Sequence, residues 1–264
     1  MLLQSPWGTV VFGAGTFILH KLDMGTAAIT AEGVGERTVV IEGYILPAGE
    51  DASARAAAME SARRLLCRTV GASDGFDLET GGKRLHLIPR ESPAFTAEAP
   101  FTGTDAAHFL LTARTAEDGA FRGGDVSVTG RALEGSLIFP LGISEETVLA
   151  TLSGDGTLTV VNGGDLPCGF AARITAEGGP LESLSLSLDG DTVTVTHRLE
   201  DGGEIVLDTR PARKGVWAGG TSVMEDVAWD SVFFSLKPGE NRIGWRSEGF
   251  GHAVMRLTFQ PRYL

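Results

Sequence analysis

Short runs in which apolar and polar residues alternate dominate the chain, and this period of two is typical of half-buried β-strands. The clearest example joins residues 184–188 to residues 192–196 through Asp189-Gly190-Asp191, which predicts a tight hairpin. A second hairpin is predicted around Gly81-Gly82. Further strands are expected at residues 9–20, 27–31, 38–46, 75–79, 83–89, 95–101, 107–115, 157–161, 204–208, 232–236, 241–245 and 253–259. The pattern predicts a mainly β protein.

One segment, residues 51–70, has the composition of a helix. It is rich in alanine, Asp51 or Ser53 can cap its start, and Gly71 can end it. Its helical spacing predicts one narrow apolar face made of Ala58, Ala62, Leu65 and Thr69.

A segment with glycine and proline, residues 131–146, divides the pattern in two. It contains Gly135, Pro140 and Gly142, and a proline does not fit a central strand. Strands mix with the helix before this segment, whereas strands alone follow it. We therefore expect an N-terminal β domain over residues 1–135, with the helix at about 51–70, and a C-terminal β-sandwich or jelly roll over residues 145–264.

Composition and charge exclude several classes of protein. Glycine is frequent, at 36 of 264 residues, but has no collagen period and so indicates many tight turns. The net charge of −12 repels phosphate, so we expect no nucleic-acid partner. No apolar run approaches the ~20 residues that cross a bilayer, and no signal peptide opens the sequence. We expect synthesis in a cytoplasm and no membrane insertion, with Cys67 and Cys168 buried and reduced.

Residues that could carry catalysis are present, but not in catalytic patterns. The histidines are far apart in the sequence, and neither C-x-x-C nor H-x-x-x-H occurs, so no metal site is expected. Nucleophile-elbow and P-loop motifs are missing as well. Turn chemistry explains Asp155, Asp189 and Asp191 better than calcium binding does. We predict no enzyme activity, no catalytic, cofactor-binding or metal-binding residues and no cofactor, and we assign no ligand-binding residues.

Three tryptophans suggest that the protein could bind carbohydrate. Trp217, Trp229 and Trp245 fall within 29 residues, and exposed tryptophans on a β-sandwich can stack on sugar rings. One function that the sequence suggests is therefore that of a carbohydrate-binding jelly-roll module for host-surface adhesion. Burial is the favoured interpretation, because Trp245 continues the face of Ile243 and large aromatic residues are mostly buried.

The C-terminal half contains a pattern that resembles the siphovirus tail-component family, the distal tail proteins of phages. The matching positions are Asn162, Gly164, Asp165, Pro167, Asp208, Thr209, Ser231, Phe233, Phe234, Leu236, Pro238, Gly239 and Asn241, followed by the closing LTFQPRYL. The helix segment ARRLLCRTVG also resembles the family, although the resemblance is specific only for residues 158–264. These residues are typical of fold-making positions: Pro238-Gly239 predicts a turn, and residues 232–236 predict a strand packed on both faces.

This resemblance implies a split-barrel-like N-terminal domain that forms a ring and a galectin-like C-terminal sandwich. It implies a homohexameric adaptor hub in the virion tail tip, joining the tail tube to the tail-tip and host-adhesion proteins. The implied partners are the tail tube protein and the tail-tip hub protein, with receptor-binding proteins as further candidates. Galectin-type sugar sites use a His-x-Asn-Pro-Arg strand, whereas here His197 is followed by Arg198-Leu199-Glu200, so we expect no sugar binding.

Overall fold

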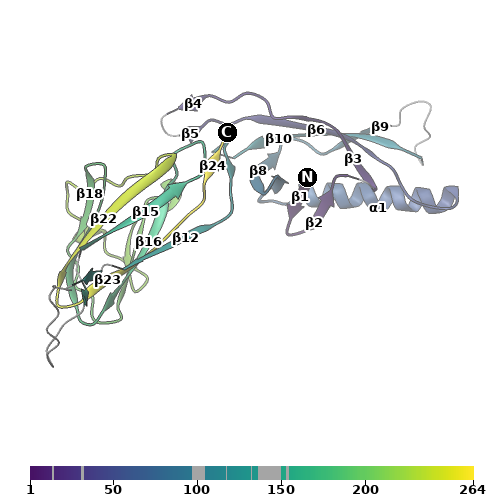
Figure 1. Ribbon diagram of the computed structural model, residues 1–264. Coiled ribbons are helices and arrows are strands. Elements are labelled where there is room, and N and C mark those ends of the chain that lie inside the picture. Colours follow the sequence, from purple (N-terminus) through teal and green to yellow (C-terminus); the bar gives the residue numbers. More distant parts are fainter. Residues whose placement is uncertain are drawn as a thin grey trace. The chain divides into compact units, whose positions relative to one another are not determined.

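The chain folds into two compact units (Figure 1). The computed structural model describes residues 1–13, 15–30, 33–96, 105–116, 118–131, 133–135, 150–152 and 155–264. One unit consists of Met1–Gly124 with Tyr263–Leu264, and the other of Asp125–Arg262. This division differs from the joint expected at residues 131–146, most of which lies outside the described residues. The difference arises because β12 (Val126–Arg131) pairs with β23 (His252–Phe259) of the C-terminal unit.

The N-terminal unit is an antiparallel sheet with a helix packed on its apolar core. Its elements are β1 (Leu2–Ser5), β2 (Gly8–Val11), β3 (Phe17–Asp23), β4 (Ile29–Thr30), β5 (Gly33–Val34), β6 (Thr38–Ile45), α1 (Ala52–Val70), β7 (Phe76–Thr80), β8 (Lys83–Pro89), β9 (Ala94–Thr96), β10 (Ala107–Thr115) and β11 (Phe121–Arg122). The strand order is β2-β1-β7-β8-β10-β6-β3, and β9 pairs with β10. The two end strands meet at one corner through a bridge between Phe12 and Phe17, as expected for a split barrel.

Phe12 and Phe17 also account for an error in the sequence prediction. Residues 9–20 were expected to form one strand, but the structure has β2 and β3 with a loop between them. The loop places both rings in the core, where Phe12 lies 6.4 Å from Phe17 and 6.1 Å from Phe109, measured between ring centroids. Of the strands expected at 27–31 and 95–101, only Ile29–Thr30 and Ala94–Thr96 are observed, and Ala31 and residues 97–101 lie outside the described residues.

The ends of helix α1 agree with the prediction. The side chain of Asp51 accepts a hydrogen bond from the backbone N–H of Ala54 at 2.7 Å, and the N–H of Gly71 donates to the carbonyl of Cys67 at 2.9 Å. Both contacts satisfy backbone groups that a helix end leaves unpaired. None of the described helices combines the length and the apolar character needed to cross a membrane.

The buried face of α1 is turned slightly from the expected one. Its buried residues are Met59, Ala62, Leu66, Thr69 and Val70. Ala62 and Thr69 were predicted, whereas Ala58 and Leu65 are only partly buried and Met59, Leu66 and Val70 are buried in addition. The helix approaches β2 closely at Gly8, where an added Cβ would lie 2.6 Å from Thr69 Oγ1.

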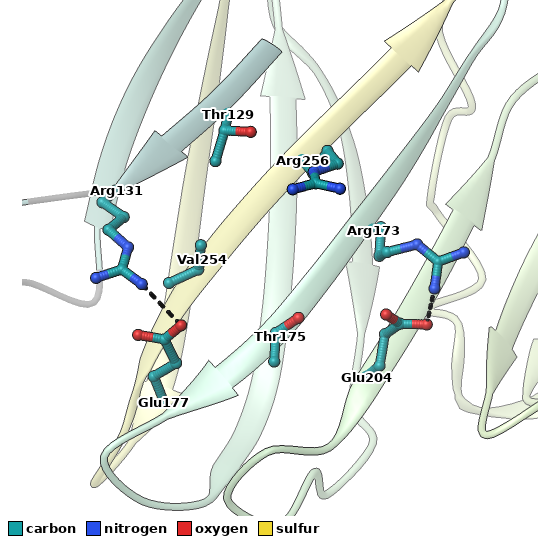
Figure 2. Close-up of a pocket in the computed structure, with 8 residues that line it drawn as sticks. All are labelled: Thr129, Arg131, Arg173, Thr175, Glu177, Glu204, Val254 and Arg256. Carbon is teal, nitrogen blue, oxygen red and sulfur yellow. Dashed lines mark hydrogen bonds and ion pairs between the residues drawn. The ribbon is translucent and has the colours of Figure 1, made fainter. Parts of the chain in front are cut away.

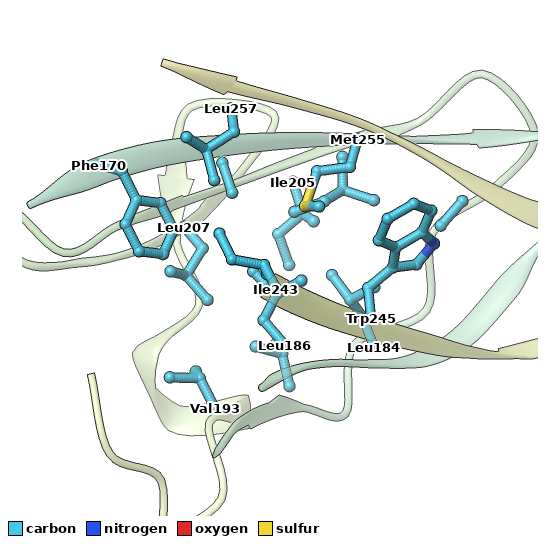
Figure 3. Packing of buried hydrophobic residues seen from close by; sticks show 14 of the residues in the cluster. Phe170, Leu184, Leu186, Val193, Ile205, Leu207, Ile243, Trp245, Met255 and Leu257 are labelled. Carbon is cyan, nitrogen blue, oxygen red and sulfur yellow. The ribbon is translucent and has the colours of Figure 1, made fainter. Parts of the chain in front are cut away.

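The C-terminal unit is a β-sandwich. Its elements are β12, β13 (Leu133–Gly135), β14 (Ala150–Leu152), β15 (Asp155–Asn162), β16 (Phe170–Glu177), β17 (Leu181–Leu188), β18 (Asp191–Val195), β19 (Glu204–Asp208), η1 (Pro211–Arg213), β20 (Gly215–Ala218), β21 (Thr221–Ser222), η2 (Met224–Asp226), β22 (Gly239–Gly249) and β23, while β24 (Arg262–Tyr263) spans the division. One sheet has the order β12-β23-β16-β19-β20-β21 and the other β15-β22-β17-β18. Alternate residues of both sheets fill the core (Figure 3).

The predicted hairpins are present, but one predicted strand is wrong. Asp189 and Gly190 have φ values of 54° and 100° and connect β17 to β18, and the glycine pair at 81–82 connects β7 to β8. Residues 232–236 form no regular strand. We call residues 232–236 the crossing segment. Its backbone is hydrogen-bonded near its two ends: the N–H of Val232 donates to the carbonyl of Thr192, and Leu236 forms a bridge with Cys168.

Trp245 on β22 joins three strands of the sandwich. Its side chain is 3% exposed and lies in the core (Figure 3). Its ring lies against Gly130 of β12 and Gly156 of β15. An added Cβ at Gly156 would lie 2.2 Å from the ring, so these glycines make room for the indole. Burial was therefore predicted correctly for Trp245. The same prediction was wrong for Trp229, whose side chain is 97% exposed because it lies on a surface turn.

We expect the two tryptophans to differ sharply in their contribution to stability. Trp245→Ala removes a buried ring and leaves a cavity, and should lower the free energy of unfolding by about 3–5 kcal/mol. Trp229→Ala, the matched control, should change it by less than about 0.5 kcal/mol. Urea denaturation followed by circular dichroism measures both values, and equal losses would contradict the packing described.

Candidate functional site

The buried polar residues of the C-terminal unit coincide with the sequence motif. Buried polar residues in the described chain are Thr69, Thr115, Asn162, Asp208, Thr209 and Asn241. The last four belong to the C-terminal unit, and all four are motif positions. A buried polar group without a hydrogen bond is costly, so the partners of these four side chains indicate what the motif does.

Asn162 holds two chain segments together at the end of β15. Its amide nitrogen donates to the carbonyls of Leu166 and Leu236, at 3.0 and 3.1 Å. Its amide oxygen accepts from the N–H of Gly164 at 3.0 Å. The side chain thus hydrogen-bonds to backbone groups of the loop after β15 and of the crossing segment 232–236, and so ties the two together.

Asn241 performs the same role in the turn before β22. Its amide oxygen accepts from the N–H of Lys237 at 2.9 Å, and its amide nitrogen donates to the carbonyls of Lys237 and Gly239 at 2.8 and 3.0 Å. Gly239 has a φ of 89°, which L side chains rarely adopt, as expected for the glycine of a Pro-Gly turn. The motif Pro-Gly-x-Asn is therefore a self-contained turn.

Asp208 and Thr209 close the end of β19. Phe170 donates its N–H to Thr209 Oγ1 at 2.9 Å, and the N–H of Thr209 donates to the carbonyl of Phe170 at 2.8 Å. Asp208 accepts from the backbone N–H of Arg210 and from its Nε, at 3.0 and 2.9 Å. This carboxylate raises the pKa of Arg210. All four motif residues thus bind the protein's own backbone or a neighbouring side chain.

The side chains with catalytic potential do not converge. His86 pairs with Asp77 at 2.8 Å and His197 with Asp226 at 2.7 Å. Of the other three histidines, His252 lies apart with its Nε2 3.6 Å from Glu177, and His20 and His108 both contact the ring of Tyr44. Within the described part of the chain, no cluster of His, Cys, Asp or Glu could hold a metal ion.

The acidic residues weighed as calcium ligands lie in turns or pair with cations. Asp189 occupies a hairpin turn and accepts from Lys237 Nζ at 2.7 Å, a contact that raises the pKa of Lys237. Asp155 begins β15 and lies 3.9 Å from Arg246. Asp191 pairs with Leu188 across the same hairpin.

The two cysteines occupy different environments. Cys168 is buried and 2% exposed, as predicted, and burial raises the pKa of its thiol to about 11. The prediction was wrong for Cys67, which lies on the exposed side of α1 because Leu66 takes the core-facing position. Partial burial and the nearby Glu60 also raise the pKa of Cys67.

A charged hollow lies on the outer face of the six-stranded sheet (Figure 2). We call it the Arg256 face; its residues are Thr129, Arg131, Arg173, Thr175, Glu177, Glu204, Val254 and Arg256. Arg131 donates to Glu177 at 2.9 Å, and Arg173 donates to Glu204. The sequence analysis missed this face. Strand alternation could have placed each residue outward, but not beside the others.

The fold is mainly β, and the buried motif residues bind the protein's own chain, as fold-building residues do. Comparison with known families agrees: residues 163–263 match the siphovirus-type tail component, C-terminal domain. The resemblance seen in the sequence is thereby confirmed for the C-terminal unit, and it supports a structural role in a phage tail or baseplate. The family is one of structural tail components and not of enzymes.

Solved structures with a similar fold come from phages. The crystal structure of SPP1 Dit (gp 19.1) protein, described as a paradigm of hub adsorption apparatus in phages that infect Gram-positive bacteria, has a TM-score of 0.60 and 12% identity. The match covers 96% of this chain and 90% of that chain, so the fold is shared along nearly the whole length. A chain of the phage P2 baseplate has a TM-score of 0.40 and 10% identity, over 95% and 92% of the two chains. No curated protein matches the sequence.

Burial of Cys168 predicts a loss of stability in alkali. Its thiol has a pKa of about 11 in the folded protein against 9.0 for an unperturbed thiol, so the unfolded chain releases the proton first. This stabilisation is complete below pH 9 and is lost as the pH rises towards 11. Between pH 8 and pH 10 we expect wild-type protein to lose about 1.3 kcal/mol more than Cys168→Ala.

Urea denaturation at the two pH values measures this difference. Cys67→Ala is the matched control, because it leaves Cys168 in place and should keep the loss of about 1.3 kcal/mol that Cys168 contributes. If wild type and Cys168→Ala lose stability in parallel, the thiol of Cys168 does not have the raised pKa.

Proposed function

We propose that the protein is a distal tail adaptor that forms a homohexameric ring between the tail tube and the tail-tip proteins. The match of residues 163–263 to the siphovirus-type tail component domain carries this proposal. The fold shared with SPP1 Dit protein along both units supports it. In this proposal the N-terminal unit forms the ring, and the C-terminal unit is a galectin-like sandwich. The protein is made in the bacterial cytoplasm and resides in the virion tail tip.

The N-terminal unit offers a surface for self-association where β2 and β3 meet. Val11 is 62% exposed, Ile18 37% and Leu46 39%, and the N–H of Leu46 donates to the carbonyl of Thr16 at 2.8 Å. These three residues therefore lie beside the corner at which the end strands of the sheet meet. Exposed apolar groups and strand edges are the features that a neighbouring chain covers. We place part of the ring contact here.

Charge sets the conditions for assembly. Each chain carries a net charge of −12, so six copies repel one another. Salt screens such repulsion beyond about 8 Å at physiological ionic strength. Assembly should therefore strengthen from low to moderate salt, provided that the contact itself is largely apolar. A heterologous contact that closes after six copies gives a ring without free ends.

The ring contact can be tested with two matched substitutions. At high protein concentration and moderate salt, light scattering should give wild type a mass of about 166 kDa, for six chains of 27.7 kDa. Val11→Asp should raise the protein concentration needed for assembly more than about tenfold, because the contact would bury an unpaired carboxylate. Val161→Asp is the control, since Val161 is 61% exposed on β15 of the other unit.

Particle images of the same samples should show six-fold rings for wild type and for Val161→Asp. A wild-type protein that remains monomeric, with no ring in images, would overturn the adaptor proposal. Equal assembly of both variants would show that the corner of β2 and β3 is not the contact.

A further inference from the structure

The Arg256 face is built by strand register. Strands β12, β23, β16 and β19 are neighbours, and pairing places one row of residues straight across them. That row is Thr129, Arg256, Arg173 and Val206, and the next outward row is Arg131, Val254, Thr175 and Glu204. Side chains opposite one another in a sheet lie about 5 Å apart at Cβ, so the residues of a row interact.

Two like charges oppose each other in this arrangement. Arg173 and Arg256 are cross-strand partners, and like charges directly opposite destabilise a sheet. Arg173 is compensated by Glu204, which raises the pKa of Arg173 through their hydrogen bond. Arg131 is compensated by Glu177. The guanidinium of Arg256 is exposed and has neither an ion pair nor a hydrogen bond within the described residues (Figure 2).

The face thus lacks one negative charge. Three arginines and two glutamates line it, so it is locally positive on a chain with a net charge of −12. The hydroxyl group of Thr129, the cross-strand partner of Arg256, and that of Thr175 on the same face can donate further hydrogen bonds (Figure 2). An anion placed between Arg256 and Arg173 would relieve the repulsion between them.

We propose that the Arg256 face binds a carboxylate from an acidic segment of a protein partner, with Arg256 as the principal ligand. Its guanidinium can hold a carboxylate through two parallel hydrogen bonds. The other two arginines of the face already bind the carboxylates of Glu177 and Glu204, so the face accommodates this chemical group. Glu177 and Glu204 on the same face repel any anion, and they repel a multiply charged phosphate more strongly than a singly charged carboxylate. The site is separate from the ring contact proposed above and does not depend on it.

A peptide titration tests the site. Hexaglutamate is added to the full-length protein, and binding is followed by nuclear magnetic resonance through the side-chain N–H signals of arginine. Wild type should show saturable shifts of the Arg256 signal. Arg256→Gln should weaken peptide binding about tenfold. Arg256→Lys should bind with intermediate strength, because the charge remains but the paired hydrogen bonds are lost.

Arg242→Gln is the matched control, since Arg242 is exposed on β22 and has no ion pair within the described residues. It should bind hexaglutamate as wild type does. Tripolyphosphate is titrated in parallel and should bind more weakly than the peptide. The proposal is overturned if Arg256→Gln and Arg242→Gln bind the peptide equally. Tripolyphosphate binding that matches the peptide and depends equally on Arg256 would also overturn it, in favour of a general anion site.

Discussion

Pairing of the backbone groups that lie outside the two sheets is the constraint on which the C-terminal unit depends. Asn162, Thr209 and Asn241 help to meet it, because each is buried and hydrogen-bonds to backbone at the ends of strands or in the loops beside them. An unpaired buried amide or carbonyl would cost about 1–3 kcal/mol. These hydrogen bonds hold the loops, while strand pairing sets the register of β12, β23, β16 and β19 in the six-stranded sheet. The Arg256 face exists only because of that register.

Local rules were enough to predict the elements whose geometry is set by neighbouring residues. The hairpin at Asp189-Gly190 and the ends of helix α1 follow from turn and capping chemistry, and both are as expected. Residues 232–236 were predicted wrongly because an apolar run shows only that side chains are buried, not whether a strand lies alongside. Trp229 was misassigned for a similar reason: its exposure depends on the position of a turn, which its own side chain does not reveal.

The candidate sites were less predictable than the fold. Asn162, Asp208, Thr209 and Asn241 could be recognised as a motif, but their role became clear only when their partners were known. Strand alternation could place each residue of the Arg256 face outward but could not bring them together, because the order of β12, β23, β16 and β19 joins residues as far apart as 129 and 256. Sheet order and register depend on long-range packing, which a pattern within one segment does not record.

The central claim is that the buried polar residues of the sequence motif build the fold of the C-terminal unit. Native-state hydrogen exchange tests it directly at the amides of Gly164, Phe170 and Lys237, which donate to the side-chain oxygens of Asn162, Thr209 and Asn241. The account predicts that these three amides exchange as slowly as those of the central strands, and only through global unfolding. Exchange as fast as that of exposed turn amides would show that the side chains do not hold the loops, and would contradict the account.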